Sequence, residues 1–175
     1  MSQVRDRAGA ARHAYVEDFL ELGRGAHYAQ LAVEEDGVVH FLHAARGGPE
    51  SIESVTPSGG TAFLHATAVG KSMLAEMPEQ RREALLSRDL EPVTPRTITD
   101  PELLREELDR IREEGFAVND QEQVLGARSV GCAVKYVSGG LMGAIVVSGH
   151  ASRFDDARIE ELASSVMGAA NQIEI

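Results

Sequence analysis

Apolar residues recur three and four positions apart in five stretches of this chain, the spacing that gathers side chains on one face of a helix. Helices are therefore predicted at residues 5–22, 66–76, 78–86, 101–114 and 153–173. The Thr-Asp-Pro-Glu segment at 99–102 offers a cap, a proline in the first turn and a glutamate placed for a capping box. Ser152, with Asp155 three residues later, is expected to cap the last helix.

Runs rich in β-branched residues predict strands between these helices. Two pairs of strands, at 26–33 with 38–43 and at 129–137 with 141–148, are each joined by a glycine-containing turn typical of a hairpin. A third, weaker strand is expected at 52–55. Antiparallel hairpins separated by helices, with helices at both ends, predict an α+β fold in which helices flank an antiparallel sheet.

Composition narrows the classes of protein that this fold can serve. The formal net charge is −11, and Lys71 and Lys135 are the only lysines, whereas a phosphate-binding surface needs clustered basic residues. We therefore expect no DNA binding by these residues alone. No apolar run approaches the roughly 20 residues that span a bilayer, so no membrane contact is expected. Cys132 is the single cysteine, which excludes an internal disulfide and favours a reducing cytoplasm.

Motifs for chemistry are weak. Gly70-Lys71-Ser72 matches only the end of a phosphate-binding loop, whose first glycine would fall at His65, so nucleotide binding is not predicted. His40 and His43 point to opposite faces of their strand and make a poor metal pair. Cys132 lies in an apolar strand and is expected to be a small buried residue rather than a nucleophile. The sequence thus indicates no metal, no cofactor and no enzyme.

The start of the helix at 66–76 allows two interpretations. Its small residues, 66–70, suit a helix end whose unpaired N–H groups bind a carboxylate or phosphate. They equally suit a helix that packs closely on a sheet, and both interpretations stay open.

The strand that includes Ala127 also allows two interpretations. Alternation places Ala127 and Ser129 on one face, Arg128 on the other, and Ser148 at the end of the partner strand. Their hydroxyls fit either a lined pocket or bonding to nearby backbone, and this alternative stays open too.

Five segments in order resemble the C-terminal effector-binding domain of IclR-type transcription regulators. They are residues 64–71, where His-Ala-x-x-x-Gly-Lys opens a helix, and residues 97–102, 115–122, 126–129 and 147–153. The resemblance covers the chain from about Ala26. It implies a GAF-like effector-binding domain at residues 25–175, preceded by a linker-proximal helix at 1–24.

The resemblance further implies a small-molecule effector held between the sheet and the helix at 66–76, with the N–H groups of Ala68 and Val69 on its carboxylate. The effector-binding positions it suggests are Ala68, Val69, Gly70, Asn119, Ala127, Ser129, Val146 and Ser148. It also implies a homodimer or a dimer of dimers. A winged helix-turn-helix domain normally precedes the effector domain and would provide the only DNA contact. It is absent from these residues, which leaves open an excised domain or a stand-alone sensor.

This chain departs from the family pattern at the polar positions. Asn119 stands where the family has an acid, Ser129 where it has a cysteine, and Val146 where it has a serine; Ser148 is retained. A methyl group in place of a hydroxyl leaves a polar ligand group unpaired, at about 1–3 kcal/mol if the group is buried. We therefore expect a more apolar carboxylate, aromatic or branched, rather than the family's small keto acids.

The mechanism expected from this resemblance is a population shift. The effector would bind one dimer arrangement better and so change the spacing of attached DNA-binding domains, with the helix at 5–22 transmitting the change. Two alternatives belong to other classes. One is a stand-alone GAF-like sensor that acts through a protein partner, and the other is a small hydrolase with Ser129 or Cys132 as nucleophile.

Overall fold

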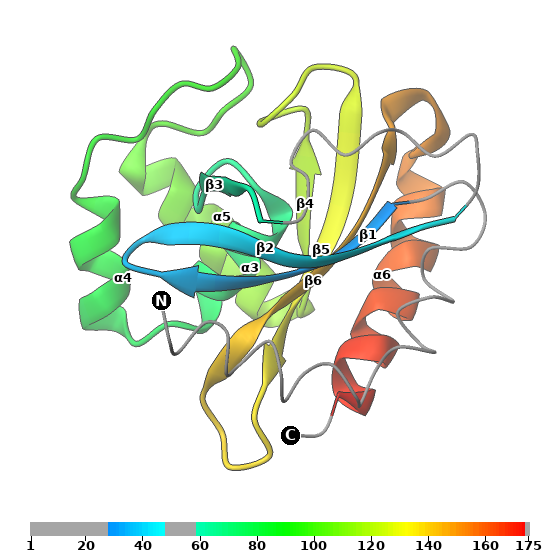
Figure 1. The fold of residues 1–175 in the computed structure, drawn as a ribbon. Helices are drawn as coiled ribbons and strands as arrows, with labels where there is room; N and C mark the ends of the chain where they lie inside the picture. The colour runs from blue at the N-terminus through cyan, green and yellow to red at the C-terminus, as the bar shows by residue number, and fades with distance from the viewer. Residues whose placement is uncertain (1–27, 48–58, 174–175) are drawn as a thin grey trace.

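The computed structural model describes residues 28–47 and 59–173 (Figure 1). Its elements, in chain order, are β1 (Tyr28–Glu35), β2 (Val38–Arg46), β3 (Thr61–Phe63), α3 (Ala68–Glu76), α4 (Glu79–Leu86), α5 (Pro101–Glu114), β4 (Ala117–Asp120), β5 (Ala127–Lys135), β6 (Leu141–His150), the 3-10 turn η1 (Ala151–Arg153) and α6 (Asp156–Gln172). The predicted helix at 5–22, with the proposed 1–24 unit, and the predicted strand at 52–55 lie outside the described residues.

One six-stranded antiparallel sheet, in the order β3-β2-β1-β6-β5-β4, forms the centre of the fold. Both predicted hairpins are confirmed. Asp36 and Gly37 turn the first with positive φ angles of 55° and 84°, and Gly139 and Gly140 turn the second with 81° and 89°. Pairing of β1 with β6 joins the two hairpins into one sheet. The predicted α+β class is confirmed.

Helices cover both faces of this sheet. Figure 1 shows α6 on one side of the curled sheet and α3, α4 and α5 on the other. Alternation divides the strand residues accordingly: Ile145 and Val147 of β6 join the core under α6, whereas Ala144 and Val146 join the core under α3. Because both faces are covered, β6 is buried without interruption from Met142 to Val147. None of the described helices is both long enough and apolar enough to span a membrane.

The sequence pattern did not predict two of the strands, β3 and β4. β3 has three residues, too few for alternation to be read, and β4 has four, the shortest run in which it can be. β4 nevertheless pairs with β5 along its whole length, which places Asn119 beside Ser129. The missed β4 therefore matters for the site described below.

The structure corrects the cap predicted for α6 and the capping box predicted for α5, whereas a cap from the Thr99-Asp100 pair is confirmed. Asp155, rather than Ser152, caps α6 by accepting a hydrogen bond from the Arg158 N–H at 2.8 Å, and Ser152 lies in the preceding 3-10 turn. Asp100 caps α5 by accepting from the Glu102 N–H, which makes Glu102 the second helical residue. A capping box needs a glutamate at the third position, so none forms there.

Candidate ligand-binding site

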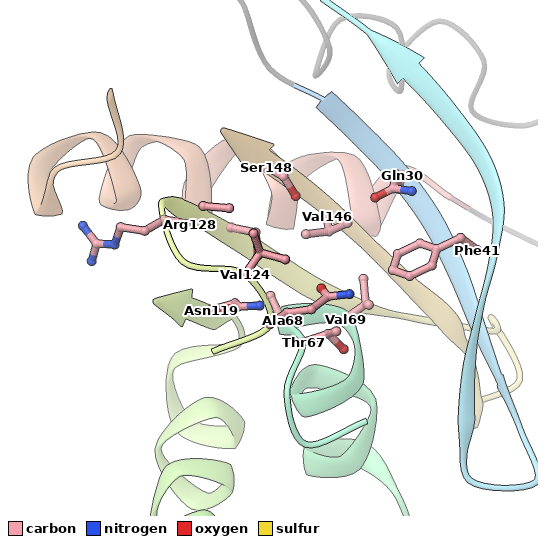
Figure 2. Close-up of a pocket in the computed structure, with 13 residues that line it drawn as sticks. Gln30, Phe41, Thr67, Ala68, Val69, Asn119, Val124, Arg128, Val146 and Ser148 are labelled. Carbon is pink, nitrogen blue, oxygen red and sulfur yellow. The ribbon is translucent and has the colours of Figure 1, made fainter. Parts of the chain in front are cut away.

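A cavity of about 50 Å³ lies between the start of α3 and the sheet face that α3 covers. Its lining residues come from both hairpins, β4 and the segments around them: Gln30, Phe41, Thr67, Ala68, Val69, Asn119, Gln123, Val124, Ala127, Arg128, Ser129, Val146 and Ser148 (Figure 2). One water needs roughly 10–15 Å³ of such space, so the cavity admits only a small molecule without rearrangement. Seven of the eight positions suggested by the resemblance lie around it.

The N-terminus of α3 forms one wall of the cavity. Thr67 caps the helix: its Oγ1 accepts from the Gly70 N–H at 3.0 Å and donates to the Phe63 carbonyl at 3.0 Å. The N–H groups of Ala68 and Val69, the first two of the helix, have no acceptor within residues 28–47 and 59–173. They are orphan donors of the kind that bind anions at helix starts.

Glycines allow this helix end to lie close to its neighbours. A Cβ added to Gly131 of β5 would stand 2.9 Å from the carbonyl carbon of Ala68, and one added to Gly70 would stand 2.1 Å from the Leu64 carbonyl oxygen. The close-packing interpretation of the small residues is therefore correct, and it coexists with two open N–H groups. Gly70 itself packs against the Leu64 backbone and is the one suggested position that does not line the cavity.

Asn119 connects two walls of the cavity. Its Nδ2 donates to the Ala66 carbonyl at 3.0 Å, and its Oδ1 accepts from the Glu122 N–H at 2.8 Å. The sequence suggested a lost charge at this position, and the structure adds a bridging role. A carboxylate here has no hydrogen to donate to Ala66, so the amide makes a contact that an ionised acid does not reproduce.

The sheet supplies two unpaired hydroxyls. Ser129 and Ser148 are direct cross-strand neighbours and both line the cavity. Within residues 28–47 and 59–173 no hydrogen bond of either hydroxyl is found, and Ser129 as a residue is 8% exposed. Of the two interpretations left open by the sequence, this arrangement fits the lined pocket. Arg128, as alternation predicts, points away from the other labelled side chains (Figure 2). It donates hydrogen bonds to the Phe154 carbonyl and to Asp156.

Several lining residues were missed by sequence reasoning. Gln30 is a buried polar residue within the apolar run of β1, and that exception was the available signal. Phe41 of β2 and Val124, just before β5, close the cavity with apolar surface. Their contribution depends on which strands become neighbours, and the pattern of a single strand does not reveal this.

Lys71 does not act as a phosphate-binding lysine. It is fully buried, and its Nζ donates to Glu107 at 3.0 Å and to Glu122 at 2.9 Å. The rejection of a nucleotide-binding loop at Gly70-Lys71-Ser72 thus has a physical basis, since the ammonium group is already engaged. No cluster of three or more metal-binding side chains occurs in the parts of the chain that the structure describes.

Cys132 lies on the opposite face of the sheet, in the core under α6. Burial there raises the pKa of its thiol to about 11, so the nucleophilic thiolate is scarce near neutral pH. The prediction of a small buried residue is confirmed. The thiol is also separated from the candidate site by the sheet itself, which argues against a cysteine hydrolase acting in this cavity.

These features define a class: an α+β domain with a small, sheltered cavity whose open groups are neutral hydrogen-bond donors. Residues 24–175 match the family described as "Bacterial transcriptional regulator IclR C-terminal". The chain therefore belongs to the IclR family, as its C-terminal domain. This family consists of transcriptional regulators, in agreement with the prediction that the chain is not an enzyme.

Similarity to individual relatives supports this family assignment. The chain is 37% identical over 156 residues to the "Probable HTH-type transcriptional regulator ArcR" of Halobacterium salinarum, covering 85% of this chain and 58% of that protein. It is 32% identical over 110 residues to the "Transcriptional repressor IclR" of Escherichia coli, covering 62% and 40%. The fold superposes on the crystal structure of the Thermotoga maritima IclR with a TM-score of 0.85, at 30% identity, covering 96% of this chain and 67% of that one. The chain thus spans only about half the length of these two sequence relatives.

Proposed function

We propose that residues 25–175 form a sensor domain that binds a small carboxylate in the cavity at the start of α3. The observation that carries this proposal is the convergence of three unengaged donors on one cavity. These are the N–H groups of Ala68 and Val69 and the hydroxyl of Ser129, a residue that is only 8% exposed. A buried donor without a partner costs about 1–3 kcal/mol, and a ligand oxygen would recover this.

The electrostatics favour an anion over a neutral ligand. The helix dipole places partial positive charge at Ala68, and the first turn of α3 contains no acidic residue to neutralise it. Arg128 is the one charged residue among the described residues that line the cavity, and its guanidinium is engaged with Asp156 outside it. The proposed ligand is therefore singly charged and held by neutral donors.

The size of the cavity refines the ligand expected from sequence. A cavity of about 150 Å³ is known to hold benzene, and this one measures about 50 Å³. An aromatic carboxylate would require Phe41 and Val124 to move apart. Of the two expected kinds of ligand, the volume favours a short branched carboxylate over an aromatic one.

In a complete regulator, binding would favour one arrangement of a homodimer and thereby change the spacing of attached helix-turn-helix domains. The printed names of the relatives support the link to transcription, and the cytoplasm is the compartment in which such a regulator would act. A stand-alone sensor that signals through a protein partner remains the alternative. Chromatography of the chain with and without ligand, followed by light scattering, distinguishes a dimer from a monomer.

Thermal melts against a panel of carboxylates test the proposal. The panel contains acetate, pyruvate, 3-methyl-2-oxobutanoate and benzoate. We expect a concentration-dependent rise in melting temperature for the short acids and a weaker one for benzoate. Ser129→Ala should reduce affinity about 10-fold or more, because a hydrogen bond to a charged group contributes about 1.5–3 kcal/mol.

The matched control is Ser164→Ala, an exposed serine of α6 whose hydroxyl contacts only its own helix. It should leave every shift unchanged. The proposed site would be wrong if a panel member bound the Ser129→Leu chain as tightly as the unaltered one, since the leucine fills the cavity. Absence of any shift with all four acids would contradict the carboxylate assignment.

A further inference from the structure

A buried ion cluster joins three segments beside the cavity. Lys71 comes from α3, Glu107 from α5, and Glu122 from the segment that follows β4. The ammonium of Lys71, with a side-chain exposure of 0%, contacts Oε1 of both glutamates. Glu107 is also paired with Arg110, whose guanidinium donates to it at 3.0 and 3.1 Å. The two positive charges of Lys71 and Arg110 balance the two negative charges of Glu107 and Glu122. Because Glu107 is already paired with Arg110, Glu122 is the partner that depends on Lys71.

Stability alone does not account for this pair. Well-packed apolar residues in place of a buried ion pair are often neutral or stabilising, because two charges must be stripped of water. Here the cost is visible: Oε2 of Glu122 is buried and has no hydrogen-bond partner among the described residues. Burial raises the pKa of Glu122, with Glu107 adding to the rise and Lys71 opposing it. The presence of a buried ion pair with an unpaired oxygen therefore calls for an explanation other than stability.

Glu122 is the residue from which one cavity wall begins. Its N–H donates to Asn119 Oδ1 at 2.8 Å, and its carbonyl accepts from the Thr97 hydroxyl at 2.6 Å. The next two residues, Gln123 and Val124, line the cavity. The side chain of Glu122 is thus the direct tie between this wall and α3, the helix whose N-terminus forms the opposite wall.

We propose that Lys71 is a positioning residue: by holding Glu122, it fixes the wall formed by residues 122–126 against α3 and so sets the affinity of the cavity. The consequence for affinity rests on the proposed function. The consequence for the order of the wall does not, because it concerns only contacts within the chain.

The decisive variant is the double substitution Lys71→Met with Glu122→Leu in the full chain. It replaces both charges by apolar side chains of similar size, so the fold should melt within a few degrees of the unaltered chain. The wall, however, loses its tie to α3. Amide hydrogen exchange should then accelerate about tenfold or more at the N–H groups of Glu122, Gly126 and Ala127, which bond within this segment and to Asn119.

The chain provides a matched control in its other lysine. Lys135 is half exposed and pairs with Glu76 at 2.7 Å, and it does not line the cavity beside α3. Lys135→Met should leave exchange in residues 122–127 unchanged. If the double variant fails to fold, Glu122→Gln serves instead: it keeps the size and the main-chain bonds and loses the ion pair, and we expect a smaller acceleration. Unchanged exchange in either folded variant would overturn the proposal.

Titration with 3-methyl-2-oxobutanoate, the branched acid of the panel, supplies the second measurement. The double variant should bind about tenfold more weakly, while Lys135→Met binds normally. If Lys71 only stabilises the fold, the result should differ. The double variant, whose melting temperature stays near that of the unaltered chain, should then bind the ligand as tightly as the unaltered chain. If 3-methyl-2-oxobutanoate does not bind even the unaltered chain, the ligand assignment fails, and the hydrogen-exchange result still decides the role of Lys71.

Discussion

The two helices that cover opposite faces of the sheet begin in opposite electrostatic environments. α6 starts with Asp155 as its cap and Asp156 in its first turn, both exposed to solvent. α3 starts with the neutral Thr67, has no acidic residue in its first turn, and directs two N–H groups at a sheltered cavity. The positive end of α6 is therefore neutralised by acids of its own first turn, whereas the first turn of α3 contains no acid to neutralise its positive end.

The sheet faces beneath these helices differ in the same way. Under α6, the strands present a continuous apolar layer that includes Val130, Cys132 and Val147. Under α3, the same two strands present Ser129 and Ser148. Because side chains alternate along a strand, one hairpin builds a closed core on one side and a polar-lined cavity on the other.

Helical glycines provide the strongest way to test this contrast. Gly70→Ala in α3 should destabilise the fold by about 3 kcal/mol or more, because the added methyl group would lie 2.1 Å from the rigid Leu64 carbonyl. Gly168→Ala in α6 meets no atom within 4 Å and should stabilise it by about 0.5–1 kcal/mol. Urea denaturation measures both. Similar effects at the two glycines would show that α3 is not held as closely as described.

Thiol reactivity compares the two faces directly. With a pKa of about 11 against an ordinary 9.0, Cys132 should react with iodoacetamide at pH 8 about a hundredfold more slowly than a free thiol. Since the folded-state pKa is the higher one, ionising this thiol should cost stability only as the pH rises from 9 towards 11.

A cysteine placed at Ser129 in a Cys132→Ala background provides the counterpart. It faces the cavity and the N-terminus of α3, which lowers thiol pKa values, so it should react much faster than Cys132. Mass spectrometry of the alkylated chain gives both rates. Equal rates for the two positions would contradict the assignment of one closed and one open face.

The helix caps give the smallest expected effects. Thr67→Val removes the acceptor for the Gly70 N–H and should cost about 2 kcal/mol. Asp155→Asn keeps a capping oxygen on α6 and loses only a charge, which should cost about 0.3–1 kcal/mol. Thermal melts at two salt concentrations separate them, because only the second loss shrinks as salt increases. A salt-dependent loss for Thr67→Val would contradict the neutral cap.

Sequence predictions agreed with the structure where they depend on residues close together in the chain. Both hairpins, the positions of α4 and α5, and the burial of Cys132 depend on neighbours within a few residues, and these predictions were confirmed. The cap of α6 and the capping box of α5 were misjudged, because in each case two nearby polar residues could act as the cap and the pattern does not say which one does. β4 was missed because its four residues are the shortest run in which a period can be read.

The residues alone suggested parts of the candidate site, and only the resemblance to a family joined those parts into one site. Alternation placed Ala127 and Ser129 on one face, but no pattern in β5 says that Asn119 or Gln30 will lie nearby. Gly70 illustrates the limit: it belongs to the motif, and its role is to admit the Leu64 backbone rather than to line the cavity.

The sequence by itself determined the kinds of element, the two hairpins and a helix start free of acidic residues, because these follow from local periodicity, turn chemistry and side-chain charge. Only the tertiary structure decided what that helix start faces and what holds the wall opposite it. Asn119 bonds to Ala66 across 53 residues of chain, and Lys71 bonds to Glu122 across 51. Contacts at such separations arise from the packing of α3 on the sheet, and no local pattern encodes them.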